Sequence, residues 1–162
     1  MNNYKKIFVV FAFALATVLN AGLFQEGNKI VSNGKGVILI FDSKVCSYCD
    51  VLKTDLKEDK KLNSFAKKFN IYLIPKEEYK EYEMGDKVPA KKVNTTSLAM
   101  AFNVKGSPNI IIFDKYWNKI FHLPGYAYPA QMISFFKFVD GLHDGKYKVN
   151  DWQKYLKEEG VY

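Results

Sequence analysis

The sequence contains no arginine, so all 24 of its basic residues are lysines. Arginine supplies the planar fork of donors that reads phosphates and base edges, and a lysine ammonium does not replace it. The lysines are also interleaved with acids, as in residues 53–61 (KTDLKEDKK) and 75–83 (PKEEYKEYE). Although the formal net charge is +7, this pattern is typical of solvated faces. We therefore expect no nucleic-acid partner.

The sequence also lacks an N-terminal apolar run long enough to cross a bilayer. The uncharged stretch from Ile7 to Leu19 has 13 residues, against roughly 20 for a transmembrane helix. Lys5 and Lys6 precede it and the small residue Ala21 follows, which is the layout of a secretory signal peptide. We expect residues 1–21 to be removed and the protein to be periplasmic or otherwise exported. A retained membrane anchor is the alternative.

Cysteine is scarce, since Cys46 and Cys49 are the only two. Exported proteins use structural disulfides to join distant segments, but a bridge between these two closes almost no loop and stabilises little. The pair is therefore half of a metal site, a local disulfide of no consequence, or a reactive redox pair. Zinc needs four ligands, or three and a water, and His122 and His143 lack zinc-finger spacing from the cysteines. We expect no metal, no other cofactor, and structural roles for both histidines.

The remaining chain, residues 22–162, has a length that suits one domain with a single core. Short apolar runs rich in β-branched residues predict buried strands, and a last strand follows as a hairpin partner. These strands are residues 36–41 (GVILIF), 70–75 (NIYLIP), 109–113 (NIIIF) and 119–124 (KIFHLP).

Helical spacing of apolar residues predicts two short helices between Cys46 and Phe69, with a break near Asp59. Further helices are expected at residues 95–102, 129–142 and 150–162, the last docked by Trp152 and Leu156. Residues 76–94 have no clean period, so we expect a surface insertion there. A βαβ half followed by a ββα half is the arrangement of a thioredoxin-like domain.

Two motifs carry a family resemblance. A buried strand that ends just before Cys-Ser-Tyr-Cys, and a Gly-Ser-Pro turn that opens a later strand, resemble the redox motif and cis-proline loop of the thioredoxin fold. The order C-x-x-C, LKTDL, SLAMAFNVKGSPNIIIFD and LPGYAYPAQMISFFKFVDG is similar to exported thioredoxin-related proteins of the SoxW type. The resemblance implies an α/β, thioredoxin-like fold with a central mixed β-sheet flanked by helices.

The helical spacing that begins at Cys46, together with the resemblance, indicates site residues. Cys46 would stand at a helix N-terminus, where free backbone N–H groups favour a thiolate, and would form a mixed disulfide that the shielded Cys49 resolves. A cis bond between Ser107 and Pro108 would turn the Ser107 backbone towards an extended substrate beside Cys46. Tyr48 is a further candidate for substrate binding. With Tyr126 and Tyr128 it forms either an aromatic rim for an apolar peptide or a coincidental grouping among 11 tyrosines.

The sequence departs from thioredoxin at the position six before Cys46, where a buried aspartate is replaced by Ile40. Asp42, two residues on and on the same side of the strand, becomes the candidate for proton transfer with Cys49. The alternative is that Asp42 only caps the following turn. Lys44 either supports the thiolate or is an ordinary exposed loop lysine.

Together these features predict an exported thiol:disulfide oxidoreductase that reduces disulfides in other exported cysteine-containing proteins, acting as a monomer. The resemblance implies electron supply by a membrane thiol carrier of the DsbD or CcdA kind. A disulfide oxidant or isomerase, or a non-catalytic peptide-binding thioredoxin-like module, is the alternative.

Overall fold

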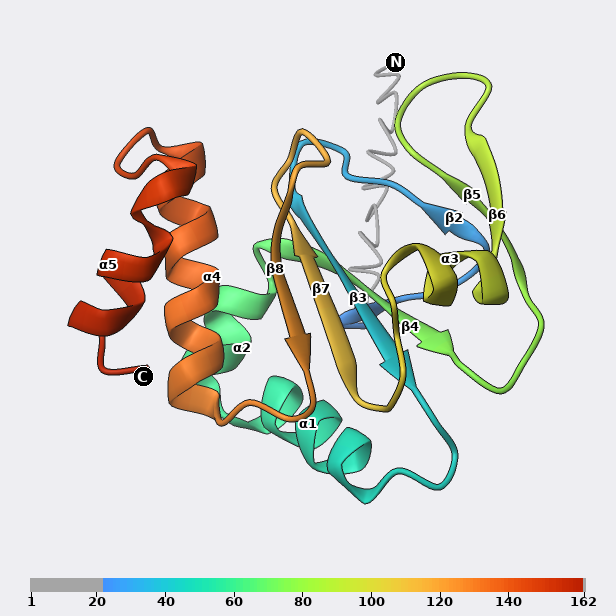
Figure 1. Ribbon diagram of the computed structural model, residues 1–162, viewed down its shortest axis with the longest axis horizontal. Helices are drawn as coiled ribbons and strands as arrows, with labels where there is room; N and C mark the ends of the chain where they lie inside the picture. The colour runs from blue at the N-terminus through green and yellow to red at the C-terminus, as the bar shows by residue number, and fades with distance from the viewer. Residues whose placement is uncertain (1–21, 162) are drawn as a thin grey trace, which may run out of the picture.

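A five-stranded mixed sheet forms the centre of the computed structural model, which describes residues 22–161 (Figure 1). The predicted signal peptide lies outside the described residues. The strand order is β1-β4-β3-β7-β8, with β3 parallel to β4 and antiparallel to β7. The strands are β1 (Phe24–Gln25), β3 (Gly36–Asp42), β4 (Phe69–Pro75), β7 (Asn109–Phe113) and β8 (Lys119–Pro124).

The central strands are apolar without alternation because both faces of the sheet are covered. Side chains such as Ile38 and Ile40 face one buried cluster, and Leu39 and Phe41 face another. Figure 1 shows α2, α4 and α5 on one side of the sheet and α3 on the other. The predicted mixed sheet flanked by helices is confirmed. Within residues 22–161, no helix is both long and apolar enough to span a membrane.

The predicted break between the first two helices is also confirmed. Helix α1 (Ser47–Glu58) ends at Asp59, whose Oδ1 accepts a hydrogen bond of 2.8 Å from the backbone N–H of Leu62 and so caps α2 (Lys60–Ala66). The later helices are α3 (Thr95–Ala101), α4 (Pro129–His143), the short 3-10 turn η1 (Val149–Asp151) and α5 (Trp152–Glu158).

The tail docks differently from the prediction. Leu156 is buried as expected, and Tyr155 is buried beside it, whereas Trp152 stays 36% exposed and meets Phe121 edge-on. Trp152 is the first residue of α5, and the helix turns Tyr155 and Leu156, three and four positions later, onto the core instead.

Residues 76–94, the expected surface insertion, contain a β-hairpin. Strands β5 (Glu81–Met84) and β6 (Lys91–Asn94) pair antiparallel, and β2 (Lys29–Ile30) joins them in a three-stranded sheet. One face of this small sheet is apolar, because Ile30 and Tyr82 are buried against the main sheet. Helix α3 follows at once, capped by Asn94, whose Oδ1 accepts a 2.8 Å hydrogen bond from Ser97 N–H.

Candidate redox site

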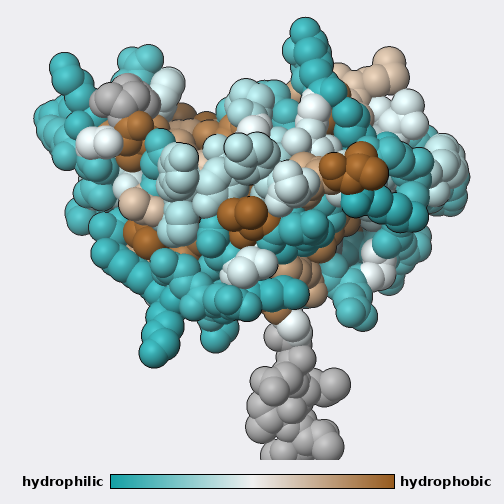
Figure 2. All heavy atoms as spheres, turned by 90° about the horizontal axis from the view of Figure 1, so that it is seen from below, coloured by the Kyte–Doolittle hydropathy of each residue, from teal (hydrophilic) through white to brown (hydrophobic). Residues whose placement is uncertain are grey.

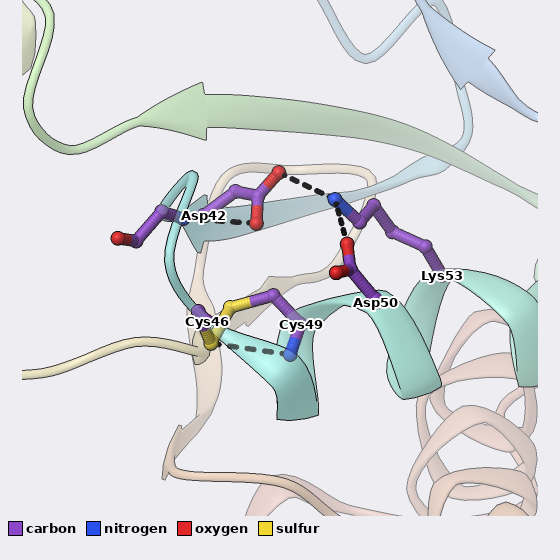
Figure 3. Close-up of polar contacts among 6 residues, drawn as sticks. Asp42, Cys46, Cys49, Asp50 and Lys53 are labelled. Atoms are coloured by element: carbon purple, nitrogen blue, oxygen red, sulfur yellow. Dashed lines mark hydrogen bonds and ion pairs between the residues drawn. A yellow bond between two sulfur atoms is a disulfide. The ribbon is translucent and has the colours of Figure 1, made fainter.

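The two cysteines form a disulfide at the start of α1, directly after β3 ends (Figure 3). Cys46 is the N-cap residue, and its Sγ accepts a 3.1 Å hydrogen bond from the backbone N–H of Cys49. This sulfur therefore occupies the place where a helix presents unpaired donors. Cys46 is partly exposed and Cys49 is 1% exposed, so an incoming sulfur can approach only Cys46.

The Ser107–Pro108 loop lies beside Cys46. Its peptide bond is cis, as the family resemblance implied. Ser107 and Cys46 line one shallow cleft of about 330 Å³, to which Val45, Tyr48 and Lys76 contribute. Pro108 is buried, and its carbonyl accepts a 2.9 Å hydrogen bond from Gly125 N–H, which fixes the loop against the segment between β8 and α4.

A second groove, of about 300 Å³, continues on the other side of this loop, where Ser107 again contributes together with Asn109, His122 and Pro124. The Ser107 hydroxyl oxygen is buried and has no hydrogen-bond partner in the described part of the chain. Seen from below, this end of the molecule shows separate hydrophobic patches among hydrophilic residues (Figure 2).

The three tyrosines named above come together next to the cysteines. Tyr48 stacks on Tyr126 with ring centroids 5.9 Å apart, and Tyr126 meets Tyr128 edge-on at 5.3 Å. The Tyr126 hydroxyl donates a 2.5 Å hydrogen bond to Asp55 on α1. Burial, followed by this bond and the charge of Asp55, raises the pKa of Tyr126 to about 12. Tyr48 and Tyr128 remain 62% and 68% exposed, so the cluster presents aromatic surface to solvent.

Asp42, at the end of β3, is held by two interactions (Figure 3). Its Oδ1 accepts a 2.9 Å hydrogen bond from Ser43 N–H, as a turn-capping acid does, and its Oδ2 pairs with Lys53 Nζ at 3.0 Å. Asp50 pairs with the same ammonium at 3.0 Å. Burial alone lowers the pKa of Lys53, but the hydrogen bonds and charges of Asp42 and Asp50 outweigh it and raise that pKa.

Lys53 is the site residue that sequence reasoning missed. It follows Cys49 by four positions, so both side chains lie on one face of α1, and that spacing is the signal that would have found it. Ile40 is 1% exposed within the core, so the position of the thioredoxin aspartate is apolar here.

The remaining candidates lie apart from the sulfur chemistry. Lys44 pairs with Glu78 at 2.8 Å on the surface, which favours the ordinary loop-lysine interpretation. His122 Nε2 bonds Asn109 Oδ1 at 2.8 Å, and His143 Nε2 accepts a 3.0 Å hydrogen bond from Lys115 N–H. Among residues 22–161, no three potential metal ligands cluster.

Comparison with known proteins identifies the family. Residues 23–140 match the family model of a thioredoxin-like domain. A solved thioredoxin-fold protein from Helicobacter pylori is 32% identical, with a TM-score of 0.73, over 87% of this chain and 96% of that one.

Two further solved structures are more distant. Thioredoxin-2 of the malaria parasite, a component of its protein secretion machinery, is 21% identical over 71% of this chain and 98% of that one, with a TM-score of 0.47. A Malassezia sympodialis thioredoxin is 14% identical over 70% of this chain and 95% of that one, with a TM-score of 0.46. No protein of curated function matches the sequence. The family match and the Helicobacter pylori structure show that the chain belongs to the thioredoxin-like domain family.

Proposed function

We propose that the protein is an exported thiol:disulfide oxidoreductase that reduces disulfides in other exported proteins. The observation that carries the proposal is the asymmetry of the cysteine pair. Cys46 holds the exposed N-cap of α1 beside a cis-proline loop, while Cys49 is buried one turn later. An attacking and a resolving thiol need these two environments.

In the proposed cycle, the Cys46 thiolate attacks one sulfur of a client disulfide. A bond forms between Cys46 and that sulfur, and the other client sulfur leaves as a thiolate that takes up a proton. Cys49 then loses its proton and attacks Cys46 Sγ, which releases the second client thiol and closes the Cys46–Cys49 bond. Two electrons pass from the dithiol to the client, whose disulfide becomes two thiols.

Asp42 is the proposed acceptor of the Cys49 proton. Its carboxylate ends the strand that leads into the site, and Lys53, on the face of α1 that also carries Cys49, holds it by a 3.0 Å ion pair. A group held in one orientation by a partner is better placed for proton transfer than a mobile loop acid. The hydrogen bond from Ser43 N–H supports the competing turn-cap role, and the two roles are separable by kinetics.

The client would lie across the cis-proline loop. The Ser107 backbone would pair with an extended client segment, and Tyr48 would contact an apolar side chain next to the client cysteine. The stacking of Tyr48 on Tyr126, and the hydrogen bond that ties Tyr126 to Asp55, support this because they fix the orientation of the aromatic surface.

The resemblance to exported reductants of the SoxW type supports the proposed direction of electron flow, from the protein to its clients. We propose electron supply by a membrane thiol carrier of the DsbD or CcdA kind, and a monomeric enzyme. An oxidant or isomerase is the second candidate, since the buried acid of thioredoxin is replaced by Ile40 and a different redox poise would follow. A peptide-binding module without redox activity is the third.

The equilibrium reduction potential of the cysteine pair separates these functions. Titration of the protein in glutathione buffers, read by alkylation and mass spectrometry, should give a reduction potential of about −270 mV for a reductant. A value between about −180 and −120 mV would identify an oxidant or isomerase. For a non-catalytic module, a variant with both cysteines replaced by alanine would retain client binding and biological function.

A further inference from the structure

The loop between β5 and β6 carries a short exposed apolar segment that is flanked by lysines. Val88 is 98% exposed, the highest value among the large apolar side chains of the described residues. Pro89 and Ala90 follow it, and Lys87, Lys91 and Lys92 flank this short apolar segment. All three lysines are exposed. We call residues 87–92 the hairpin tip.

Nearby acids offset the charge of these cations only in part. Lys29 on β2 and Lys92 on β6 flank Glu83 in the strand register of the small sheet, so they share its outer face. Within residues 22–161, the lysines of the tip and Lys29 form no ion pair, whereas Lys44, Lys53, Lys68, Lys137 and Lys154 each do. Lys29, Lys87, Lys91 and Lys92 outnumber the two acids beside them, Glu83 and Asp86, so the cluster carries a net positive charge that can meet an external anion.

The tip is held rigidly by the acid that precedes it. Asp86 Oδ1 accepts hydrogen bonds from Ser32 N–H at 2.8 Å and Asn33 N–H at 3.0 Å, and its Oδ2 accepts one from Trp117 Nε1 at 2.7 Å. These bonds direct the Asp86 carboxylate to the body of the protein and fix the base of the loop. Figure 1 shows the β5–β6 loop projecting beyond the main sheet.

The hairpin tip and the cysteines lie at opposite ends of the molecule. Asp86 binds the residues that precede β3, and Cys46 follows the end of β3. Strand β3 has seven residues, which at about 3.3 Å per residue corresponds to a separation on the order of 20 Å. Whatever the tip contacts leaves the cleft beside Cys46 open.

We propose that the hairpin tip docks on an anionic lipid surface. Val88 enters the headgroup region, and the three lysines of the tip, with Lys29, contact lipid phosphates. The hairpin tip lines one side of a groove of about 390 Å³, but it exposes only one large apolar side chain, Val88. This suits a bilayer more than a protein partner, because a stable protein interface needs about 800 Å² from each partner, and a six-residue tip supplies much less. Basic residues near an anionic membrane each strengthen binding by about fivefold. Few cations and one valine make the contact reversible and salt-sensitive.

Reversible membrane docking is compatible with the position of the cysteine site. Docking through the tip points the cysteines away from the bilayer, towards exported clients. Exchange of electrons with a carrier inside the membrane needs the other end of the molecule, so a permanent anchor at the tip would prevent it. The docking proposal does not rest on the redox chemistry, because no residue of the tip belongs to the cysteine site.

The test compares binding of residues 22–162, the expected exported form, to phosphatidylcholine vesicles with and without phosphatidylglycerol, by cosedimentation at low and high salt. The wild type should prefer the anionic vesicles and lose the preference at high salt. The triple variant Lys87→Gln, Lys91→Gln, Lys92→Gln should lose about a hundredfold in partitioning, at roughly fivefold per lysine. A matched control is Lys60→Gln, Lys61→Gln, Lys67→Gln, which removes the same charge from the exposed surface around α2.

Equal losses in the tip and control variants would show a net-charge effect and overturn the proposal, as would a wild type that does not prefer anionic vesicles.

A second measurement reports the tip directly. Tryptophan emission of Val88→Trp should shift to the blue on anionic vesicles, and that of Val149→Trp, at a site 49% exposed beside α5, should not. No shift for Val88→Trp contradicts insertion. Variants that lack Cys46 and Cys49 should bind vesicles like the wild type, so failure of the redox proposal is read separately.

Discussion

Lys53 joins two carboxylates from different elements on the helix face that also carries Cys49. Its ammonium lies 3.0 Å from Asp42 Oδ2 at the end of β3 and 3.0 Å from Asp50 Oδ1 in the first turn of α1. Both Lys53 and Asp42 are mostly buried, with side-chain exposures of 25% and 18%, whereas the Asp50 side chain is 73% exposed. The two acids therefore share one partner but differ in their surroundings, and this difference makes the role of Asp42 testable.

Asp42→Asn should slow resolution of the mixed disulfide by about ten- to a hundredfold, which is at the low end of the range for a positioned base. Asp50→Asn is the matched control, since it removes the other acid on Lys53 and should change the rate little. Rapid-mixing measurements across about pH 6 to 9 give the rates and pH profiles. An unchanged rate and profile in Asp42→Asn would leave Asp42 as a turn-capping acid only.

Cys46 should be alkylated quickly at neutral pH in the reduced protein, and Cys49 slowly. The reason is that only Cys46 combines exposure with the unpaired donors of a helix N-terminus, while Cys49 is 1% exposed. Timed alkylation followed by peptide mass spectrometry measures both rates. Equal labelling of the two thiols in the folded protein would contradict the assignment of roles.

The hydrogen bond between Tyr126 and Asp55 should stabilise the fold as well as the aromatic cluster. Tyr126→Phe removes the hydroxyl that donates to Asp55 and should lower the free energy of unfolding by about 1.5–3 kcal/mol, the range for a bond to a charged group. Asp55→Asn should lower it too, and the double variant should fall short of the sum of the two losses. Additive losses from urea unfolding would show that the two groups do not interact.

Asp86 should make stability fall in acid. Burial alone raises its pKa, but hydrogen bonds from Asn33, Trp117 and Ser32 outweigh burial and lower that pKa below the usual value of 3.8. A carboxyl whose folded pKa is depressed contributes stability above its unfolded pKa and loses it as the pH falls through the folded pKa. The melting temperature of the wild type should therefore drop below about pH 4.

Asp86→Asn tests this window, because it leaves no group to titrate. Its melting temperature should be lower at neutral pH, and the difference from the wild type should shrink as the pH falls below about 4. A difference that stays constant across the acid range would show that Asp86 stabilises the hairpin without its charge. Glu81→Gln, at an exposed position on the same sheet, is the control for removing one acid.

The parts of the fold that the sequence predicted are those with strong local patterns. Strand β3 is apolar on both faces, and α1 and α2 show a helical period interrupted at Asp59. These three elements can therefore be predicted from the local sequence without knowledge of tertiary contacts. The placement of Cys46 at a helix N-terminus followed from the same local pattern. The family resemblance added the cis bond before Pro108.

The parts that could not be predicted depend on contacts between distant segments. Strand β2 has two residues and β5 and β6 have four each, which is too short for a period-2 pattern to stand out. The pairing of these strands depends on the burial of Ile30 and Tyr82 against the main sheet, which the sequence does not show. Lys53 joined the site for a similar reason, since its partner Asp42 lies on another element. The sequence likewise did not indicate that α5 buries Tyr155 rather than Trp152.

The most direct test of the account is to trap the mixed disulfide. Full-length Cys49→Ala, in reduced form, should form a covalent adduct with a protein disulfide substrate through Cys46, because the attacked client can no longer be released from within. Cys46→Ala should form none, since Cys49 is buried. Non-reducing electrophoresis and mass spectrometry identify the linked cysteine. Adducts through Cys49 in Cys46→Ala, with none in Cys49→Ala, would contradict the proposed roles, and the absence of adducts in both would contradict disulfide exchange itself.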